Sequence, residues 1–239
     1  MKIQWNPTTI QWFRDASAYT GYGRKLTELL LPYIPHRGTL CDMGCGAAVV
    51  DFEFAKYFQD VTCVDISPEA IAEVTAQAQT QGVSNLHPVC IDGKEFRGSF
   101  DTVIALFHGG PNIYEDYYPL AKQQLIIVTH LGKCNTFSSK KHQEDHHFSS
   151  NRTKVLLDEL KIRYTYLEES IEYGQPFHCL EDAISFMEIY KAPGMTQEEL
   201  MENLEQRLVK TEDPVFPYYL PNQKRMAIFI INKQENPEK

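Results

Sequence analysis

Short apolar runs alternate with longer helical patterns between residues 39 and 129, and this alternation limits the possible folds more than any other feature. The runs predicted as strands are Thr39–Met43, Val61–Ile66, Leu86–Ile91, Thr102–Phe107 and Leu125–Thr129. Most are apolar throughout, as expected of strands that are covered on both faces. Helices are predicted at Val50–Phe58 and Pro68–Thr80. Ser67 is the expected N-cap of the second helix, and Gly82 ends it. Alternating strands and helices predict βα units and a parallel sheet.

The chain has 239 residues, of which 43% are hydrophobic and 23% charged, a composition typical of one globular domain. Further strands are predicted near Arg163–Ile171 and at Arg225–Asn232. The expected fold is therefore a Rossmann-like, doubly wound α/β sheet of seven mainly parallel strands, with helices on both faces. Its expected parts are a helical cover (1–35), a ligand-binding core (36–132), a polar lid or loop (133–153) and the C-terminal half of the sheet (154–239).

Three further helices are predicted in the C-terminal half of the chain. They span Lys154–Lys161, Leu180–Tyr190 and Gln197–Lys210. Thr196 and Glu199 have the spacing of a capping box, which indicates where the last helix begins. The second and third helices together predict a helical insertion over residues 180–210, before the final strand.

The charge and the apolar runs exclude several classes of partner. The chain carries 23 basic and 32 acidic residues, a net charge of −9. Such a surface repels phosphate backbones and argues against a nucleic-acid partner. Apolar runs such as Leu125–Val128 are far shorter than the roughly 20 residues that span a bilayer. The N-terminus lacks the apolar segment of a secretory signal, so we expect a cytoplasmic protein with no membrane partner.

A glycine turn follows the first predicted strand. The stretch Leu40–Ala48 contains Gly44 and Gly46, which allow a sharp turn and a close approach of the backbone to a ligand. The second strand ends at Asp65, at the neighbouring position on the carboxyl edge of a parallel sheet. A carboxylate there accepts the hydroxyl hydrogens of a ribose. The pairing predicts a site for a nucleoside-containing ligand.

The turn does not have the form of a dinucleotide site. Position 49, where a third glycine is expected, is Val49, and Asp42 would lie beside a doubly charged pyrophosphate. A nicotinamide-dependent oxidoreductase is therefore disfavoured. Asp42 suits a ligand that carries an ammonium and a sulfonium group, and S-adenosylmethionine carries both without a phosphate.

These residues resemble those of the class I S-adenosylmethionine-dependent methyltransferases. The first motif of that family is similar to Asp42-Met43-Gly44-Cys45-Gly46, and its ribose acid to Asp65, with Ile66 beside the adenine. One departure is Ala48, where many members have a third glycine, and we expect it to distort the loop without abolishing the site. The resemblance implies that S-adenosylmethionine is the cofactor.

The resemblance extends to the third and fourth strands. Asp92 and Gly93 are similar to the acidic motif that faces the adenine, although an Asp-Gly pair is also common in plain turns. The fourth motif is similar to Phe100–Phe107, and Phe107 at its end is an expected cofactor contact. The family also implies that the last strand, Arg225–Asn232, is antiparallel.

Other candidate residues have less support from the sequence. His108 follows the fourth strand and is the candidate general base, and His130 is the next candidate. The alternative is a loop histidine that only lines the wall of the site. Arg14 is a candidate for the carboxylate of the cofactor. His142 and His146, with Cys134 or His130, have the spacing of a weak metal site, but a solvated loop explains them better, and no metal is expected.

The activity that follows is methyl transfer from S-adenosylmethionine to a small or medium-sized acceptor, by in-line displacement. A non-catalytic module that binds S-adenosylmethionine would keep the same cofactor site and is the alternative. Aromatic residues of the N-terminal cover could fold over the ligands or pack in the core. They are Trp5, Trp12, Phe13, Tyr19 and Tyr22.

Overall fold

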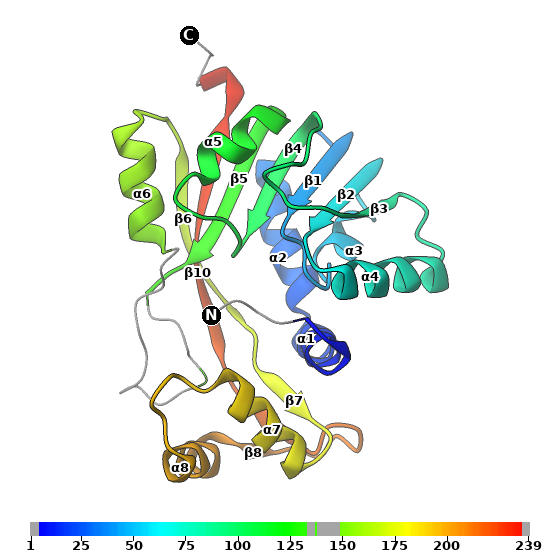
Figure 1. Cartoon of the computed structure of the whole chain (residues 1–239), viewed down its shortest axis with the longest axis vertical. Helices are drawn as coiled ribbons and strands as arrows, with labels where there is room; N and C mark the ends of the chain where they lie inside the picture. Colours follow the sequence, from blue (N-terminus) through cyan, green and yellow to red (C-terminus); the bar gives the residue numbers. More distant parts are fainter. Residues whose placement is uncertain (1–4, 133–136, 138–148, 236–239) are drawn as a thin grey trace.

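A seven-stranded sheet runs through the computed structural model, which describes residues 5–132, 137 and 149–235 (Figure 1). In spatial order its strands are β3 (Leu86–Cys90), β2 (Asp60–Asp65), β1 (Thr39–Met43), β4 (Phe100–Leu106), β5 (Ala121–His130), β10 (Gln223–Asn232) and β6 (Thr165–Glu172). Strands β1, β2, β3, β4 and β5 pair in parallel, so their carboxyl ends meet at one edge.

The last strand, β10, is the antiparallel member of the sheet. Ile228 at its centre pairs with Val128 of β5 on one side and with Leu167 of β6 on the other. Because β10 runs against its neighbours, it begins at the edge where the parallel strands end. The predicted doubly wound sheet with an antiparallel last strand is confirmed.

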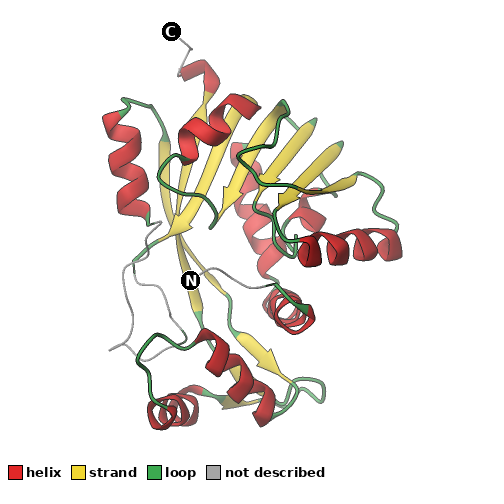
Figure 2. Cartoon of the chain, viewed as in Figure 1, coloured by secondary structure: helices red, strands yellow, loops and turns green. Residues whose placement is uncertain are grey.

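Helices cover both faces of the sheet (Figure 2). The helices are α1 (Pro7–Thr20), α2 (Tyr22–Leu30), α3 (Asp51–Phe54), α4 (Pro68–Gln81), α5 (Ile113–Tyr117), α6 (Ser150–Glu159), α7 (Leu180–Tyr190) and α8 (Gln197–Arg207). Helices α2, α3 and α4 pack on one face, whereas α5 and α6 pack on the other.

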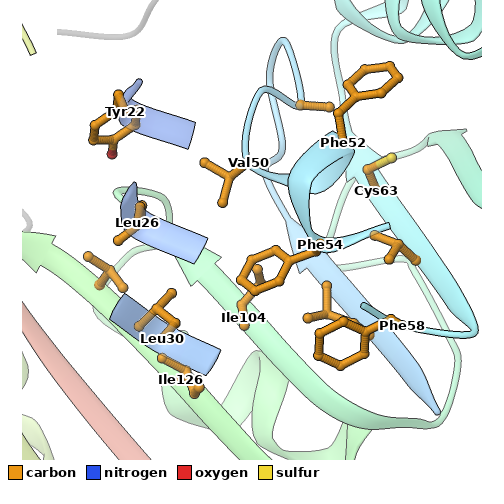
Figure 3. Packing of buried hydrophobic residues seen from close by; sticks show 14 of the residues in the cluster. Tyr22, Leu26, Leu30, Val50, Phe52, Phe54, Phe58, Cys63, Ile104 and Ile126 are labelled. Atoms are coloured by element: carbon orange, nitrogen blue, oxygen red, sulfur yellow. The ribbon is translucent and has the colours of Figure 1, made fainter. Parts of the chain in front are cut away.

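The central strands are mostly apolar because neighbouring residues enter different cores. On β4, Ile104 joins the core under α2, and Val103 joins the core under α5. Figure 3 shows Leu26 of α2 and Phe54 of α3 packed near Ile104. These side chains are fully buried, and each contributes about 1.5–3 kcal/mol to folding.

Local signals set the boundaries of some helices correctly and of others incorrectly. The Ser67 hydroxyl accepts a hydrogen bond from the amide of Ala70 at 3.2 Å, and Gly82 ends α4 with a φ of 66°. The helix predicted at Val50–Phe58 is instead the single turn α3, so that prediction was too long. Helix α6 begins four residues before the predicted Lys154, at Ser150.

The C-terminal insertion contains a sheet as well as the two predicted helices. A second, antiparallel sheet is formed by β7 (Gln175–Phe177), β9 (Tyr218–Leu220) and β8 (Val209–Lys210). Helix α8 consequently ends at Arg207, not at Lys210, because β8 follows. Strands of two or three residues are too short to show an alternating pattern. Figure 1 shows α7, α8 and β7 beyond the carboxyl edge of the main sheet, on the same side as α1.

Among the helices in the described part of the chain, none is long and apolar enough to cross a membrane.

Candidate active site

The glycine turn joins the end of β1 to the end of β2. Gly44 and Gly46 have φ values of 81° and 56°, in the left-handed region that favours glycine. The amides of Gly44 and Cys45 both donate to the carbonyl of Val64, at 2.7 and 3.0 Å. The loop is therefore held against the carboxyl end of the neighbouring strand, and Gly46 within it is buried.

Asp65 is bonded directly to this loop. Its Oδ2 accepts the amide hydrogen of Gly46 at 2.9 Å, although the two residues are 19 apart in sequence. Its Oδ1 accepts from the amide of Ser67 at 2.9 Å. The side chain of the next residue, Ile66, is 53% exposed at the same edge. The structure thus brings together the glycines, the acid and the apolar side chain that the sequence analysis singled out.

Ala48 occupies the position where a third glycine was considered. It has a φ of 53°, a left-handed conformation that costs a residue with a Cβ about 1–2 kcal/mol. Its methyl group is buried, and its amide donates to the carbonyl of Cys45 at 3.0 Å. The turn therefore closes with alanine at this position, and the burial of the methyl group offsets part of the strain.

Two buried carboxyl groups lie beneath the loop. Asp42 on β1 and Asp51 at the start of α3 are both almost fully buried. Burial raises the pKa of Asp51 to about 7. Burial, and then the neighbouring Asp51, raise the pKa of Asp42 well above its usual range. Among the described residues no amide, hydroxyl or ammonium group donates to Oδ1 of Asp42 or to either oxygen of Asp51. The pair is therefore short of hydrogen-bond donors, as a site for a cationic ligand would be.

Sequence reasoning missed Asp51. It belongs to a short helix and lies outside the strand-end positions that the sheet topology singles out. The only local signal was an acid directly after two apolar residues, Val49 and Val50. Such an acid usually lies on the surface.

His108 lies against the glycine turn. A Cβ atom on Gly44 would be 2.1 Å from Cγ of His108, so only glycine fits beneath the ring. The Nε2 atom of His108 and the hydroxyl of Tyr117 on α5 are 3.0 Å apart. Because Tyr117 lies on a helix that was not predicted, this partner was also missed.

Phe107 precedes His108 and has a φ of 55°, which is unusual for an aromatic residue and costs on the order of 1–3 kcal/mol. Such strain often accompanies function. The ring of His130, at the end of β5, lies 4.8 Å from the Phe107 ring between centroids. Phe107, His108 and His130 thus converge at the carboxyl ends of β4 and β5.

Asp92 and Gly93 follow β3. Asp92 is exposed, and its Oδ1 accepts from the amide of Lys94 at 3.0 Å, which is the geometry of a turn. A Cβ on Gly93 would lie 3.2 Å from the hydroxyl of Tyr117. Gly93 therefore borders the same cluster as His108, whereas Asp92 stabilises its own turn.

Aromatic residues of the N-terminal segment divide between two places. A Cβ on Gly46 would lie 2.3 Å from the indole of Trp5, so this ring covers the glycine turn. Phe13 connects Trp5 to Tyr173, with centroid distances of 5.4 and 5.6 Å. Trp12 instead packs against the insertion, 5.3 Å from the ring of Phe186.

Arg14 has partners on α4. Its guanidinium forms an ion pair with Glu73 at 2.5 Å and a hydrogen bond with the side chain of Gln77. The charge that was expected to meet the cofactor carboxylate is therefore paired with a glutamate in this structure.

The possible metal ligands His142, His146 and Cys134 lie outside the described residues. Within the described ranges, 5–132, 137 and 149–235, there is no group of three or more His, Cys, Asp or Glu side chains that could hold a metal ion.

Comparison with known proteins adds a family match and a shared fold. Residues 40–122 match the model of a methyltransferase domain. The YcgJ protein of Bacillus subtilis superposes with a TM-score of 0.57 and 13% identity, over 86% of this chain and 98% of that one. A SAM-dependent methyltransferase from Aquifex aeolicus superposes with a TM-score of 0.55 and 13% identity, over 95% of this chain and 100% of that one. Magnesium protoporphyrin IX methyltransferase from Synechocystis, with bound SAM, superposes with a TM-score of 0.51 and 16% identity, over 97% of this chain and 86% of that one.

The fold is that of the class I S-adenosylmethionine-dependent methyltransferases, and the segment that carries the glycine turn, Asp65 and His108 matches a methyltransferase domain. The prediction made from the motifs is confirmed at this level. Residues 40–122 match a methyltransferase domain, and one neighbour with this fold, the Synechocystis methyltransferase, has been solved with SAM and with SAH bound.

Proposed function

We propose that this protein transfers the methyl group of S-adenosylmethionine to a small or medium-sized acceptor by in-line displacement. The observation that carries the proposal is the bond between Gly46 and Asp65 above the donor-poor pair Asp42 and Asp51. A glycine turn, a ribose-type acid and two buried carboxyl groups that are short of donors suit a cationic nucleoside. The net charge of −9 favours a small acceptor over a nucleic acid.

The cofactor residues in this proposal come from four strand ends. Asp65 would accept the ribose hydroxyls, and Asp42 would hold the ammonium group. Ile66 and Asp92 would flank the adenine. The remaining contacts are Gly44, Cys45, Gly46, Gly93 and Phe107. Arg14 is left out because Glu73 and Gln77 already bind it.

The cofactor supplies an activated methyl group on a sulfonium. The task of the protein is to hold the acceptor in line with the methyl group and to exclude water. An acceptor hydroxyl or ammonium must also lose a proton, and His108 is the proposed base because its ring lies on the glycine turn. Tyr117 would orient that ring through Nε2. His130 is the second candidate.

The acceptor would bind under the covers of the carboxyl edge. We propose that the chain is one domain in which residues 36–132 hold the cofactor, whereas 1–35 and the insertion over 180–210 contribute to the acceptor site. Trp5 covers the turn, and α7 and α8 lie beyond the same edge. The Synechocystis neighbour, which is named for a porphyrin acceptor, is compatible with a small-molecule acceptor.

Asp65→Ala tests the cofactor site. Hydrogen bonds to a charged group contribute about 1.5–3 kcal/mol, so affinity for S-adenosylmethionine should fall by about 10- to 150-fold in calorimetric titration. Asp60→Ala is the matched control, because Asp60 is an exposed acid at the other end of β2. An unchanged affinity in Asp65→Ala, with the melting temperature of the wild type, would remove the ribose assignment.

A further inference from the structure

The ammonium group of Lys224 lies among three aromatic rings at the carboxyl edge of the sheet. Its Nζ is 4.0 Å from the centroid of Phe107, 5.0 Å from that of Tyr173 and 5.5 Å from that of Tyr22. Lys224 is on β10, which begins at this edge because the strand is antiparallel. Phe107 directly follows β4, Tyr173 directly follows β6, and Tyr22 begins α2, so only the tertiary structure assembles this group, the Lys224 cluster.

This ammonium lacks a carboxylate partner. Among the described residues no carboxylate oxygen lies within ion-pair distance of Nζ. Glu172, which pairs with the adjacent Gln223, accepts the hydroxyl hydrogen of Tyr219 at 2.7 Å. Burial lowers the pKa of Lys224 to about 8. The group is still mostly charged at pH 7, and a charge in such a place is normally paired.

A second donor in the cluster is also without a partner. The hydroxyl of Tyr173 is buried and forms no hydrogen bond with the described residues. A buried hydroxyl that leaves its hydrogen bond unmade costs on the order of 1–3 kcal/mol. An ammonium and a hydroxyl that both lack acceptors, inside a ring of aromatic side chains, form a site for an anionic oxygen.

The cluster touches the proposed methyl-transfer site through Phe107. This residue is in the left-handed conformation and directly precedes His108, whose ring lies on the glycine turn. Tyr22 is close enough to Asp42 for that acid to contribute, after burial, to the raised pKa of Tyr22. An anion held by Lys224 would therefore lie where the cofactor and the acceptor meet.

We propose that Lys224, assisted by the Tyr173 hydroxyl, binds a carboxylate of one of the two reactants. The inference rests on the proposed function, because it places the carboxylate in that active site. Two sources share this chemistry, the methionine end of the cofactor and an acidic acceptor. Aromatic rings replace part of the water around this half-buried ammonium, so the ion pair is stronger than a fully exposed one.

The test compares Lys224→Met, which keeps an apolar chain of similar length, with Lys224→Arg, which keeps the charge. Lys154→Met is the matched control, because Lys154 lies 5.4 Å from the ring of Tyr166 and is exposed. Each protein is titrated with S-adenosylhomocysteine and with its decarboxylated analogue. Benzoate and benzamide are then added, with and without S-adenosylhomocysteine, and thermal unfolding is recorded.

If the cofactor supplies the carboxylate, Lys224→Met should bind S-adenosylhomocysteine at least about 10-fold more weakly but bind the decarboxylated analogue as the wild type does. If the acceptor supplies it, S-adenosylhomocysteine affinity stays the same, and benzoate, but not benzamide, stabilises the wild type and not Lys224→Met. Lys224→Arg should restore most of either effect. Both results support the proposal.

The proposal is overturned if Lys224→Met matches the wild type with both nucleosides and benzoate stabilises neither protein. A wild type that does not bind S-adenosylhomocysteine overturns the proposed function instead, and the benzoate series without nucleoside then decides the role of Lys224 separately. Melting temperatures of the ligand-free variants show whether each one folds.

Discussion

At the scale of single residues, His108 is defined by what surrounds its ring. Gly44 leaves the space that the ring fills, and the Tyr117 hydroxyl lies 3.0 Å from Nε2. A histidine that only lined a wall would need neither contact. Its position also explains why position 44 requires glycine apart from any ligand, since a Cβ there would collide with the imidazole.

His108→Ala tests the proposed base once an acceptor is identified. General bases contribute about 10²–10⁴-fold to rate, so kcat should fall at least about 100-fold while affinity for S-adenosylhomocysteine stays within about two-fold. His87→Ala is the control, because His87 is an exposed histidine paired with Asp60 at the amino-terminal ends of β2 and β3. A kcat of His108→Ala equal to that of the wild type would exclude His108 as the general base.

At the scale of elements, α1 connects the main sheet to the insertion. The indole of Trp12 donates to Oδ1 of Asp182 on α7 at 2.7 Å, and its carbonyl accepts from the side chain of Gln175 at 3.1 Å. The indole ring also joins the apolar core of the insertion, with Phe186 and Leu200. Helix α1 thus fastens the insertion to the rest of the chain.

Asp182→Ala should loosen this connection. The mutation leaves the partly buried indole N–H unpaired, at a cost of about 1–2 kcal/mol, and denaturant unfolding should detect that loss. Hydrogen exchange should accelerate in α7 more than in β4. Glu181→Ala serves as the control, since Glu181 is the exposed neighbour. Unchanged exchange in α7 would show that the hydrogen bond between Trp12 and Asp182 does not hold the insertion.

At the scale of the whole molecule, the pair Asp42 and Asp51 links stability to pH. Burial raises the pKa of Asp51 from 3.8 to about 7. Between these values the folded protein holds a proton that the unfolded chain has lost, so the free energy of unfolding decreases as pH rises. The stabilisation is complete below about pH 3.8 and is lost as pH rises through about 7.

Asp51→Asn should flatten this dependence. Asparagine has a similar shape but cannot ionise, so between about pH 5 and 8 the variant should lose less stability than the wild type, by on the order of 2–4 kcal/mol. Lys224 does not interfere, because its pKa falls from 10.5 to about 8 on folding and therefore changes the free energy of unfolding only between about pH 8 and 10.5. Urea unfolding across pH measures the effect, with Asp60→Asn as the exposed control. If the free energy of unfolding depends on pH in the same way in Asp51→Asn and in the wild type, the pKa of Asp51 is not raised in the folded protein.

The part of the site that lies at strand ends could be predicted because topology brings it together. In a parallel sheet all strands end at one edge, so Gly46 and Asp65 had to be neighbours, and the 2.9 Å bond agrees. The exposed Ile66 and the ring of His108 lie at that edge for the same reason. Arg14 could not be assigned in this way, because its partner is chosen by the docking of α1 on α4.

The sequence by itself determined the sheet and the burial of its strands on both faces. It also determined where α4 begins and ends and where α8 begins. These depend on hydrophobic periodicity and on contacts within a few residues, such as the 3.2 Å cap between Thr196 and Glu199. Only the tertiary structure decided that Asp51 lies beside Asp42, that Lys224 enters an aromatic cluster and that three very short strands form a second sheet. Those features join residues far apart in the chain, and their energies depend on burial that no local pattern contains.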